Sequence, residues 1–226
     1  MKIVFTFSIE VRTISILEEI IKVNPDNPLE YCRKQIAPFA INKLNGIISK
    51  CKECATACHN NKRLFKGNPN ANFMLVTDHA TNDERIYEYL ENIMKQAGIE
   101  LDDVFYVNSV NCINTREFGD KRIVRSPSSK ETTNCKLYIK NAIDIIKPRI
   151  IILMGASSLN VFNKDNCLIE EINNWKHIYG IPVITTYSPQ DIFAFSNILD
   201  EEMLEEKASV LLGDLMKANM YINRGE

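Results

Sequence analysis

From residue 73 onward, the chain alternates short, continuous apolar runs with longer stretches in which apolar residues recur at the spacing of a helix face. The short runs predict strands at Phe73–Thr77, Val104–Val107, Arg149–Met154 and Pro182–Thr186. The longer stretches predict helices at Asn82–Ala97, Lys130–Ile146, from Ala156 onward, and at Asp200–Met220. This alternation is typical of a parallel sheet covered by helices on both faces. We therefore predict an α/β fold, a three-layer sandwich with a central parallel sheet flanked by helices.

The first part of the chain does not follow this alternation, and we interpret residues 1–50 as an N-terminal extension. The pattern predicts a strand at Lys2–Val11 and helices at Ile14–Val23 and Leu29–Ser49. A break at Asn24–Pro28, which holds two prolines, separates the two helices. We expect the extension to pack on one main domain formed by residues 51–226.

Two of the predicted helices begin with the spacing of a capping box. Thr81 precedes Glu84 by three residues, and Ser128 precedes Glu131 by three. The first pair leaves residues 77–80 as a loop between the end of a strand and the start of a helix. Because sites in such folds lie at the carboxyl ends of the strands, we expect chemistry in this loop.

The composition, with 45% hydrophobic and 25% charged residues, is ordinary for a globular protein. No stretch approaches the ~20 apolar residues that a membrane span requires. The N-terminus also lacks the basic start and unbroken apolar run of a signal peptide. We expect a cytoplasmic monomer with no membrane partner.

The chain carries no overall positive charge that would attract nucleic acid, because 27 basic and 29 acidic residues give a net charge of −2. Basic residues instead gather locally, at Arg116–Lys130 and again at Lys50–Lys66. Within the first stretch, Lys121, Arg122 and Arg125 are the candidates for DNA contact. The alternative is an ordinary solvated loop.

The seven cysteines form an odd set, so any disulfide scheme would leave at least one unpaired. In the cytoplasm they are better read as thiols or metal ligands. Cys51 and Cys54 form a CxxC pair, Cys112 follows a predicted strand, and Cys135 lies near the start of the next helix. Four thiolates can bind zinc or an iron-sulfur cluster, and the spacing does not choose between them.

Two other interpretations of the cysteines stay open. A more local zinc site would combine the CxxC pair with Cys58 and His59, although adjacent residues rarely chelate one ion comfortably. Alternatively, Cys112 and Cys135 are small buried hydrophobic residues, as free cysteines often are.

Several short sequence motifs of the chain resemble, in the same order, those of the iron-sulfur (family 4) uracil-DNA glycosylases. They are the CxxC pair, Tyr106-Val-Asn108-Ser-Val-Asn-Cys112, then Cys135, Lys147-Pro148-Arg-Ile-Ile-Ile-Leu-Met-Gly155 and Thr186-Tyr187-Ser188-Pro189. The resemblance runs from Cys51 to about Phe195 and implies that the partner is DNA. It also implies a 4Fe-4S cluster with the ligands Cys51, Cys54, Cys112 and Cys135. The stretch between the last two ligands is longer than usual in that family and holds the basic loop.

The first catalytic motif of that family reads like Gly-Glu-Ala-Pro-Gly, and residues 77–81, Thr-Asp-His-Ala-Thr, take its place. Asp78 stands where the family has its glutamate. A carboxylate there can orient water or stabilise the positive charge that develops on the sugar as the base leaves. His79 can instead hold a water or donate to the leaving base. Thr77 and Ala80 are expected to line the substrate site.

Asn108 matches the asparagine that reads uracil in that family, because a carboxamide offers one donor and one acceptor to the edge of the base. The alternative is an asparagine that ends a strand in a turn. The family's Pro-Phe segment, whose ring stacks on the base, has no counterpart in the helix that follows residue 81. Tyr87 or Tyr89 is the candidate to replace it, although a helical tyrosine is more often simply packed.

The second catalytic motif, normally Thr-Tyr-His-Pro-Ser, reads Thr-Tyr-Ser-Pro-Gln at residues 186–190. Ser188 therefore replaces the histidine that supports the departing base, and losing one such donor typically costs roughly 10² to 10³ in rate. Tyr187 and Pro189 are expected to contact the substrate. The residues that stand at the family's DNA wedge, or else pack in the core, are Ile192, Phe193 and Phe195.

Three functions are compatible with these observations. The first is a DNA glycosylase that flips uracil or a modified base into a pocket near Asp78, Asn108 and Ser188 and hydrolyses its N-glycosidic bond. The second is a catalytically inactive iron-sulfur protein of the same fold that binds DNA or a protein partner. The third, an unrelated zinc protein, requires the ordered matches to be chance. We favour the first, because Asp78 and Asn108 both keep usable chemistry.

Overall fold

The structure is a computed structural model that describes residues 27–54, 62–163, 167–194 and 200–224. The strand predicted at Lys2–Val11 and the helix predicted at Ile14–Val23 lie outside the described residues. Cys58, His59 and Phe195 lie outside them as well.

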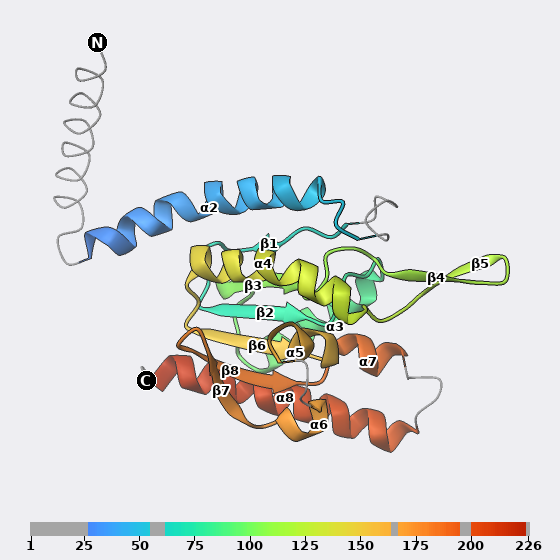
Figure 1. Cartoon of the computed structure of the whole chain (residues 1–226). Helices are drawn as coiled ribbons and strands as arrows, with labels where there is room; N and C mark the ends of the chain where they lie inside the picture. Colours follow the sequence, from blue (N-terminus) through green and yellow to red (C-terminus); the bar gives the residue numbers. More distant parts are fainter. Residues whose placement is uncertain (1–26, 55–61, 164–166, 195–199, 225–226) are drawn as a thin grey trace, which may run out of the picture.

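The elements are shown in Figure 1. The helices are α2 (Pro28–Ser49), α3 (Glu84–Gln96), the 3-10 helix η2 (Leu101–Asp103), α4 (Ser129–Ile146), α5 (Ala156–Phe162), α6 (Leu168–Glu171), α7 (Pro189–Ala194) and α8 (Glu201–Arg224). The strands are β1 (Lys66–Gly67), β2 (Phe73–Thr77), β3 (Val104–Asn108), β4 (Thr115–Phe118), β5 (Lys121–Val124), β6 (Ile150–Met154), β7 (Trp175–Ile178) and β8 (Ile181–Thr186).

The main sheet has six strands in the order β1-β3-β2-β6-β8-β7. The four inner strands run parallel, whereas β1 and β7 pair antiparallel with their neighbours at the two edges. Every residue of β2, β3 and β6 is buried, which explains why these strands read as continuous apolar runs. The sequence pattern located the inner strands and missed both edge strands, since β1 is short and exposed and β7 is largely exposed.

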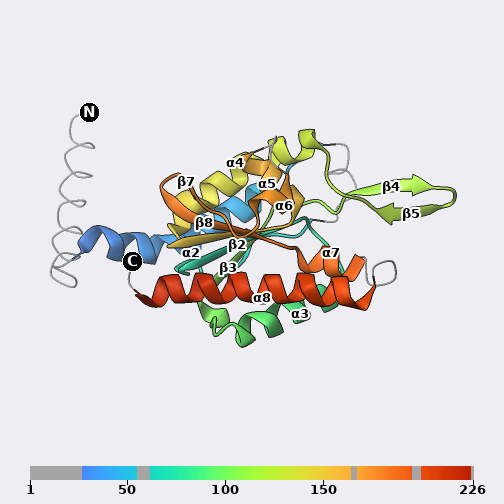
Figure 2. The ribbon, with the colours of Figure 1, turned by 90° about the horizontal axis from the view of Figure 1, so that it is seen from below.

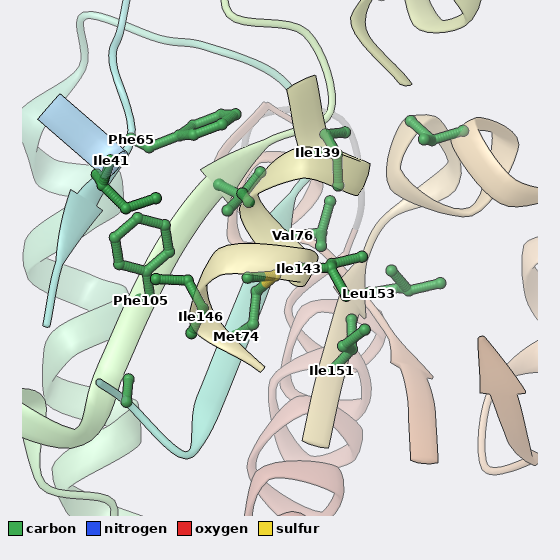
Figure 3. Packing of buried hydrophobic residues seen from close by; sticks show 14 of the residues in the cluster. Ile41, Phe65, Met74, Val76, Phe105, Ile139, Ile143, Ile146, Ile151 and Leu153 are labelled. Atoms are coloured by element: carbon green, nitrogen blue, oxygen red, sulfur yellow. The ribbon is translucent and has the colours of Figure 1, made fainter. Parts of the chain in front are cut away.

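Helices cover both faces of the sheet, so the predicted three-layer α/β sandwich is confirmed. Met74 and Val76 of β2 pack in a core with residues of α2, α4 and α5 (Figure 3). Phe73 and Leu75, which point to the opposite face, pack with α3 and α8. Figure 2 shows α3 and α8 together on that second face. None of the described helices is long and apolar enough to cross a membrane.

Helix α2 joins the first of these cores, because its buried Ile41, Leu44 and Ile48 belong to the same cluster as the sheet residues. It packs on the outer side of α4 (Figure 1). Arg33 extends this contact by donating a hydrogen bond of 2.6 Å to the carbonyl oxygen of Ile146, at the end of α4. The separation of residues 1–50 from a main domain stays a prediction.

One of the two predicted capping boxes is confirmed. Ser128 and Glu131 form a complete capping box at the start of α4. The other prediction is wrong, because Asp83 rather than Thr81 caps α3, accepting a hydrogen bond from the backbone N–H of Arg85. Thr81 instead accepts one from the backbone N–H of Asp83 at 3.1 Å, so it supports the cap from one step earlier.

The stretch that was expected to be a basic loop forms a two-stranded antiparallel hairpin, β4–β5. It follows β3 and projects beyond the end of the main sheet at which the parallel strands finish (Figures 1 and 2). At its root, the backbone N–H of Arg125 donates to the carbonyl oxygen of Asn114 at 2.9 Å. Each strand of the hairpin has only four residues and mixes polar and apolar side chains, so the sequence pattern was too short to predict it.

Candidate active site and cysteine site

The carboxyl ends of the parallel strands bring the predicted substrate residues to one edge of the sheet. Thr77 at the end of β2 stands directly opposite Asn108 at the end of β3. The Thr77 hydroxyl donates to Oδ1 of Asn108 at 3.0 Å, and Nδ2 of Asn108 reaches the carbonyl oxygen of Arg63 at 3.4 Å. Both ends of the Asn108 amide are therefore held by the protein in this structure.

Asp78 is buried, and each of its carboxylate oxygens has a partner. Oδ1 accepts a hydrogen bond of 2.7 Å from the backbone N–H of Ser157, in the first turn of α5. Oδ2 lies 3.0 Å from Nδ1 of His79. An ionised carboxylate at this distance favours the tautomer with the hydrogen on Nδ1, which leaves Nε2 of His79 free to accept a proton.

Gln190 holds the backbone of His79 from the second motif. Its side-chain amide donates to the His79 carbonyl oxygen at 2.6 Å and accepts from the His79 N–H at 3.2 Å. Ser188 is buried, and its hydroxyl oxygen accepts from the backbone N–H of Gln190 at 3.1 Å. Ser188 thus helps to start α7 and orders the residue that fixes His79.

Gly155 is the point at which Asp78 and Ser188 approach each other. Its φ of +84° is a conformation that side chains disfavour. A Cβ atom at this position would lie 2.8 Å from Cβ of Ser188 and 2.9 Å from Oδ1 of Asp78. Only glycine leaves room for both side chains against the end of β6.

Replacing Gly155 with alanine is expected to destabilise the fold by about 2–5 kcal/mol, from roughly 1–2 for the positive φ and about 1–3 for overpacking. Thermal unfolding should show the midpoint falling by roughly 4–20 °C. Gly180→Ala is the matched control, because Gly180 has a φ of +79° but nothing within 4 Å of the added methyl. Equal losses for the two variants would contradict the close packing between Asp78 and Ser188.

Two cavities flank Tyr87 on the α3 side of this edge. The larger, of about 220 Å³, is lined by Lys62, Arg63, Leu64, Lys66, Tyr87, Tyr106 and Asn108. The smaller, of about 10 Å³, is lined by Thr77, Ile86, Tyr87, Leu90, Ser188, Pro189 and Gln190 and offers about the space of one water. Nζ of Lys66 lies 4.4 Å from the centre of the Tyr87 ring, a cation–π contact in the wall of the larger cavity. Of the two tyrosines proposed to replace the stacking ring, Tyr87 lies in these walls, and Tyr89 packs against the core.

Asp191, in α7, is a carboxylate that the sequence interpretation missed. Burial, and next the negative charge of Asp78, raise the pKa of Asp191 to about 6, against the opposing effects of Lys207 and His79. Lys207 also lies over the ring of Tyr187, with Nζ 4.2 Å from the ring centre. Asp191 therefore interacts electrostatically with both members of the Asp78–His79 pair.

The other predicted positions near the site have structural contacts. Ala80 is buried, and its N–H donates to the carbonyl oxygen of Val110 at 3.0 Å. Ile192 packs in the second core cluster, as the core alternative for the wedge predicts. Nothing is described for the side chain of Phe193.

Comparison with known proteins places this geometry in a family. Residues 59–211 match the model of the uracil DNA glycosylase superfamily. The chain belongs to this superfamily. Its loop 77–81 and its second motif, residues 186–190, both lie within the matched segment.

Three relatives of the chain are named type-4 uracil-DNA glycosylase. The one from Thermotoga maritima is 24% identical over 203 residues, which cover 82% of this chain and 98% of the relative. The one from Saccharolobus solfataricus is 27% identical over 202 residues, 79% of this chain and 90% of the relative. The one from Sulfurisphaera tokodaii is 26% identical over 168 residues, 69% of this chain and 72% of the relative.

Three residues support the candidate active site although the sequence alone assigned them no role: Gly155, Ser157 and Gln190. Gly155 could have been recognised from the sequence, because a glycine directly between an apolar strand and a helix lets other groups approach the backbone closely. Ser157 acts through its backbone N–H, which any residue except proline provides. Gln190 stood in a recognised motif, but its partner lies 111 residues away in the sequence.

Of the four cysteines assigned by the resemblance, Cys54, Cys112 and Cys135 lie together beside the start of α4. Cys112 and Cys135 are buried against each other and Val110, and Cys54 packs against them. Nδ2 of Asn134 lies 3.3 Å from the sulfur of Cys54, and Nζ of Lys62 donates to the carbonyl oxygen of Cys51 at 2.7 Å.

Burial is the main cause that raises the pKa of Cys112 to about 11 and that of Cys135 to about 12. Cys51 and Cys54 raise both pKa values further through their charge. Buried thiols so close together need a positive partner to become thiolates, which is what a metal centre provides.

Among the described residues, no three His, Cys, Asp or Glu side chains are arranged to hold a metal ion. The local zinc alternative with Cys58 and His59 lies outside the described residues.

Proposed function

We propose that this chain is a DNA glycosylase that accepts a base flipped out of DNA, uracil or a modified base, and hydrolyses its N-glycosidic bond. The observation that supports this most is the Asp78–His79 pair. It is oriented by the N–H of Ser157 and clamped by Gln190, at the strand ends that also hold Thr77 and Asn108. A buried carboxylate with two donors is suited to a fixed role in catalysis rather than to solvation.

In this mechanism, the C1′–N bond breaks and its electron pair leaves with the base. The negative charge of Asp78 stabilises the positive charge that develops on the sugar. Asp78 also orients the His79 imidazole, whose Nε2 accepts the proton of the water that adds to C1′. Ser188 positions Gln190 by accepting a hydrogen bond from its backbone N–H, and its own hydroxyl hydrogen stays available as a donor.

The base would enter the larger cavity, beside Asn108 and Tyr87. There Asn108 exchanges its contact with the Arg63 carbonyl oxygen for the edge of the base. The Tyr87 ring offers an aromatic surface for stacking in the wall of this cavity, where Lys66 also contacts it through a cation–π interaction. A volume of about 220 Å³ is ample for a single base.

For the cofactor, we propose a 4Fe-4S cluster held by Cys51, Cys54, Cys112 and Cys135. When bound, it would supply a covalent link between the end of α2, the segment after β3 and the start of α4. The hydrogen bond from Asn134 to Cys54 supports this, because such donors are typical around cluster thiolates.

For DNA contact, we keep Lys121, Arg122 and Arg125 as candidates and give Arg125 a different part. Its guanidinium forms two hydrogen bonds of 2.8 Å with Glu131, so it anchors the hairpin to α4. Lys121 and Arg122, by their position in β5, would supply the contacts with phosphate.

The test is base release from a panel of DNA duplexes that carry uracil, hypoxanthine, xanthine or another modified base. Single-turnover release from at least one duplex, with the same sequence unmodified as the control, is the expected result. Tight binding to every duplex without release from any would reject the hydrolytic function.

A second candidate function, a non-catalytic DNA-binding protein, is favoured by one observation. The space next to Ser188 is only about 10 Å³, and Tyr87 lines both this space and the larger cavity. Neither Asp78 nor His79 lines the larger cavity, so a base that stays in that cavity does not contact the pair. Binding without release in the panel would support this function.

A further inference from the structure

The hairpin β4–β5 projects from the edge of the sheet that carries the candidate active site, and hydrogen bonds hold its base in place. It begins seven residues after Asn108 and extends away from the helices (Figures 1 and 2). The two hydrogen bonds between Arg125 and Glu131, together with the capping box of α4, fix its root. A four-residue strand spans roughly 13 Å, enough to reach well past the surface of the strand ends.

An aromatic side chain stands at the tip of this projection. Phe118 is the last residue of β4, and 71% of its surface is exposed. The turn that follows begins at Gly119, whose φ is +59°. Because side chains alternate along a strand, Phe118 and the exposed Arg116 share one face of β4, while Glu117 points to the other. The face that carries the ring therefore also carries a cation and no carboxylate from β4.

The charge of the hairpin is opposite to that of the whole chain. Residues 115–124 hold three basic residues, Arg116, Lys121 and Arg122, and two acidic ones, Glu117 and Asp120, which gives +1 within a chain of −2. Two-stranded ribbons fit the grooves of DNA, and apolar side chains such as phenylalanine unstack base steps where they enter. Ile192, the described residue at the family's wedge position, is packed in the core instead.

We propose that Phe118 enters the base stack of duplex DNA and fills the gap left by the flipped nucleotide, with Arg116 contacting phosphate beside it. This inference rests on the proposed function, since it assumes that a nucleotide leaves the duplex. One segment of the chain would then supply both groups. Asn108, at its start, lines the pocket for the flipped nucleotide, and Phe118, at its end, takes the place of that nucleotide in the duplex.

The test uses the full chain and a duplex with an abasic-site analogue opposite 2-aminopurine, which reports stacking by its fluorescence. Wild type should bind this duplex and change the fluorescence. Phe118→Ala should bind roughly 5- to 100-fold more weakly, the range expected for loss of one stacked aromatic, and should lose the fluorescence change. Phe118→Trp should restore both.

The matched control is Phe39→Ala, because Phe39 is also 71% exposed but lies on α2. It should bind like wild type. Unchanged binding by Phe118→Ala, equal losses for the two variants, or an equal loss on a fully paired duplex would each overturn the inference. The readout does not depend on base release, so a Phe118 effect without any release would reject the hydrolytic function and keep the role of the hairpin.

Discussion

Replacing Asp78 with asparagine is expected to lower the rate of base release by at least roughly 10²- to 10³-fold. The change removes the negative charge that faces the sugar. It also leaves a mismatch, because the N–H of Ser157 and Nδ1 of His79 both face an oxygen of this side chain, and an amide has only one. The measurement is single-turnover release on the best substrate of the panel, which isolates the chemical step.

The matched control for this variant is Asp144→Asn, which removes a carboxylate from the exposed side of α4. It should release base at the wild-type rate. If Asp78→Asn kept that rate as well, the carboxylate would have no part in the chemistry, and His79 would have to act without it.

The same variant offers a readout that does not depend on activity. Burial is the first cause of the raised Asp191 pKa and the charge of Asp78 the second, so Asp78→Asn should lower the Asp191 pKa from about 6. A titration of Asp191 followed by NMR would detect this shift. A lowered pKa together with lost activity would assign the loss to charge rather than to unfolding.

The parts of the fold that the sequence predicted are those in which one local pattern decides the structure. The inner strands are buried on both faces, so their apolar runs stand out, and α3, α4 and α8 follow from helical spacing. The edge strands and the hairpin face solvent and carry no such pattern. The start of α3 was misjudged because Thr81 and Asp83 are both good caps, and only the backbone path chooses between them.

The site was predictable as a set of neighbours along the chain, and not as a set of contacts. Asp78 and His79 are adjacent in sequence, so their pairing needed no tertiary information. The partners that orient them lie 79 residues away at Ser157 and 111 residues away at Gln190. Ser157 acts through its backbone N–H and Gln190 through its side-chain amide, and neither group can be recognised as part of a site from the sequence. The contact between Ser188, which replaces a histidine, and Gln190 is local, because the two residues are two positions apart.

Of the four predicted ligands, Cys54, Cys112 and Cys135 lie together in the structure, and their role as ligands stays a prediction. Cys112 and Cys135 meet because a strand end and a helix start meet, which the α/β pattern implies. The supporting contacts of Asn134 and Lys62 come from tertiary packing. They show that the segment beside the larger cavity, Lys62–Lys66, is tied at its start to the cysteine site.

Replacing Cys112 with serine is expected to remove the iron from the protein and to destabilise it. Protein purified without oxygen should carry about four irons and four sulfides per chain, and the variant fewer than about one, because a hydroxyl is a poor substitute for a thiolate. Loss of a structural metal centre typically costs about 4 kcal/mol or more, which lowers the unfolding midpoint by roughly 8–16 °C in a chain of this size. Iron and sulfide assays, visible absorption and thermal unfolding together make the measurement.

The control for this prediction is Cys167→Ser, since Cys167 is exposed and has no assigned role. It should keep the iron, the absorption and the stability of wild type. Stoichiometric zinc without iron in the wild type, or equal effects of the two variants, would contradict the ligand assignment.

Lys62 links the cysteine site to the larger cavity. Because the Lys62 side chain donates to the carbonyl oxygen of Cys51, and Arg63 next to it lines the cavity of Asn108, loss of the cluster should also weaken DNA binding, even though none of the described cysteines lines that cavity.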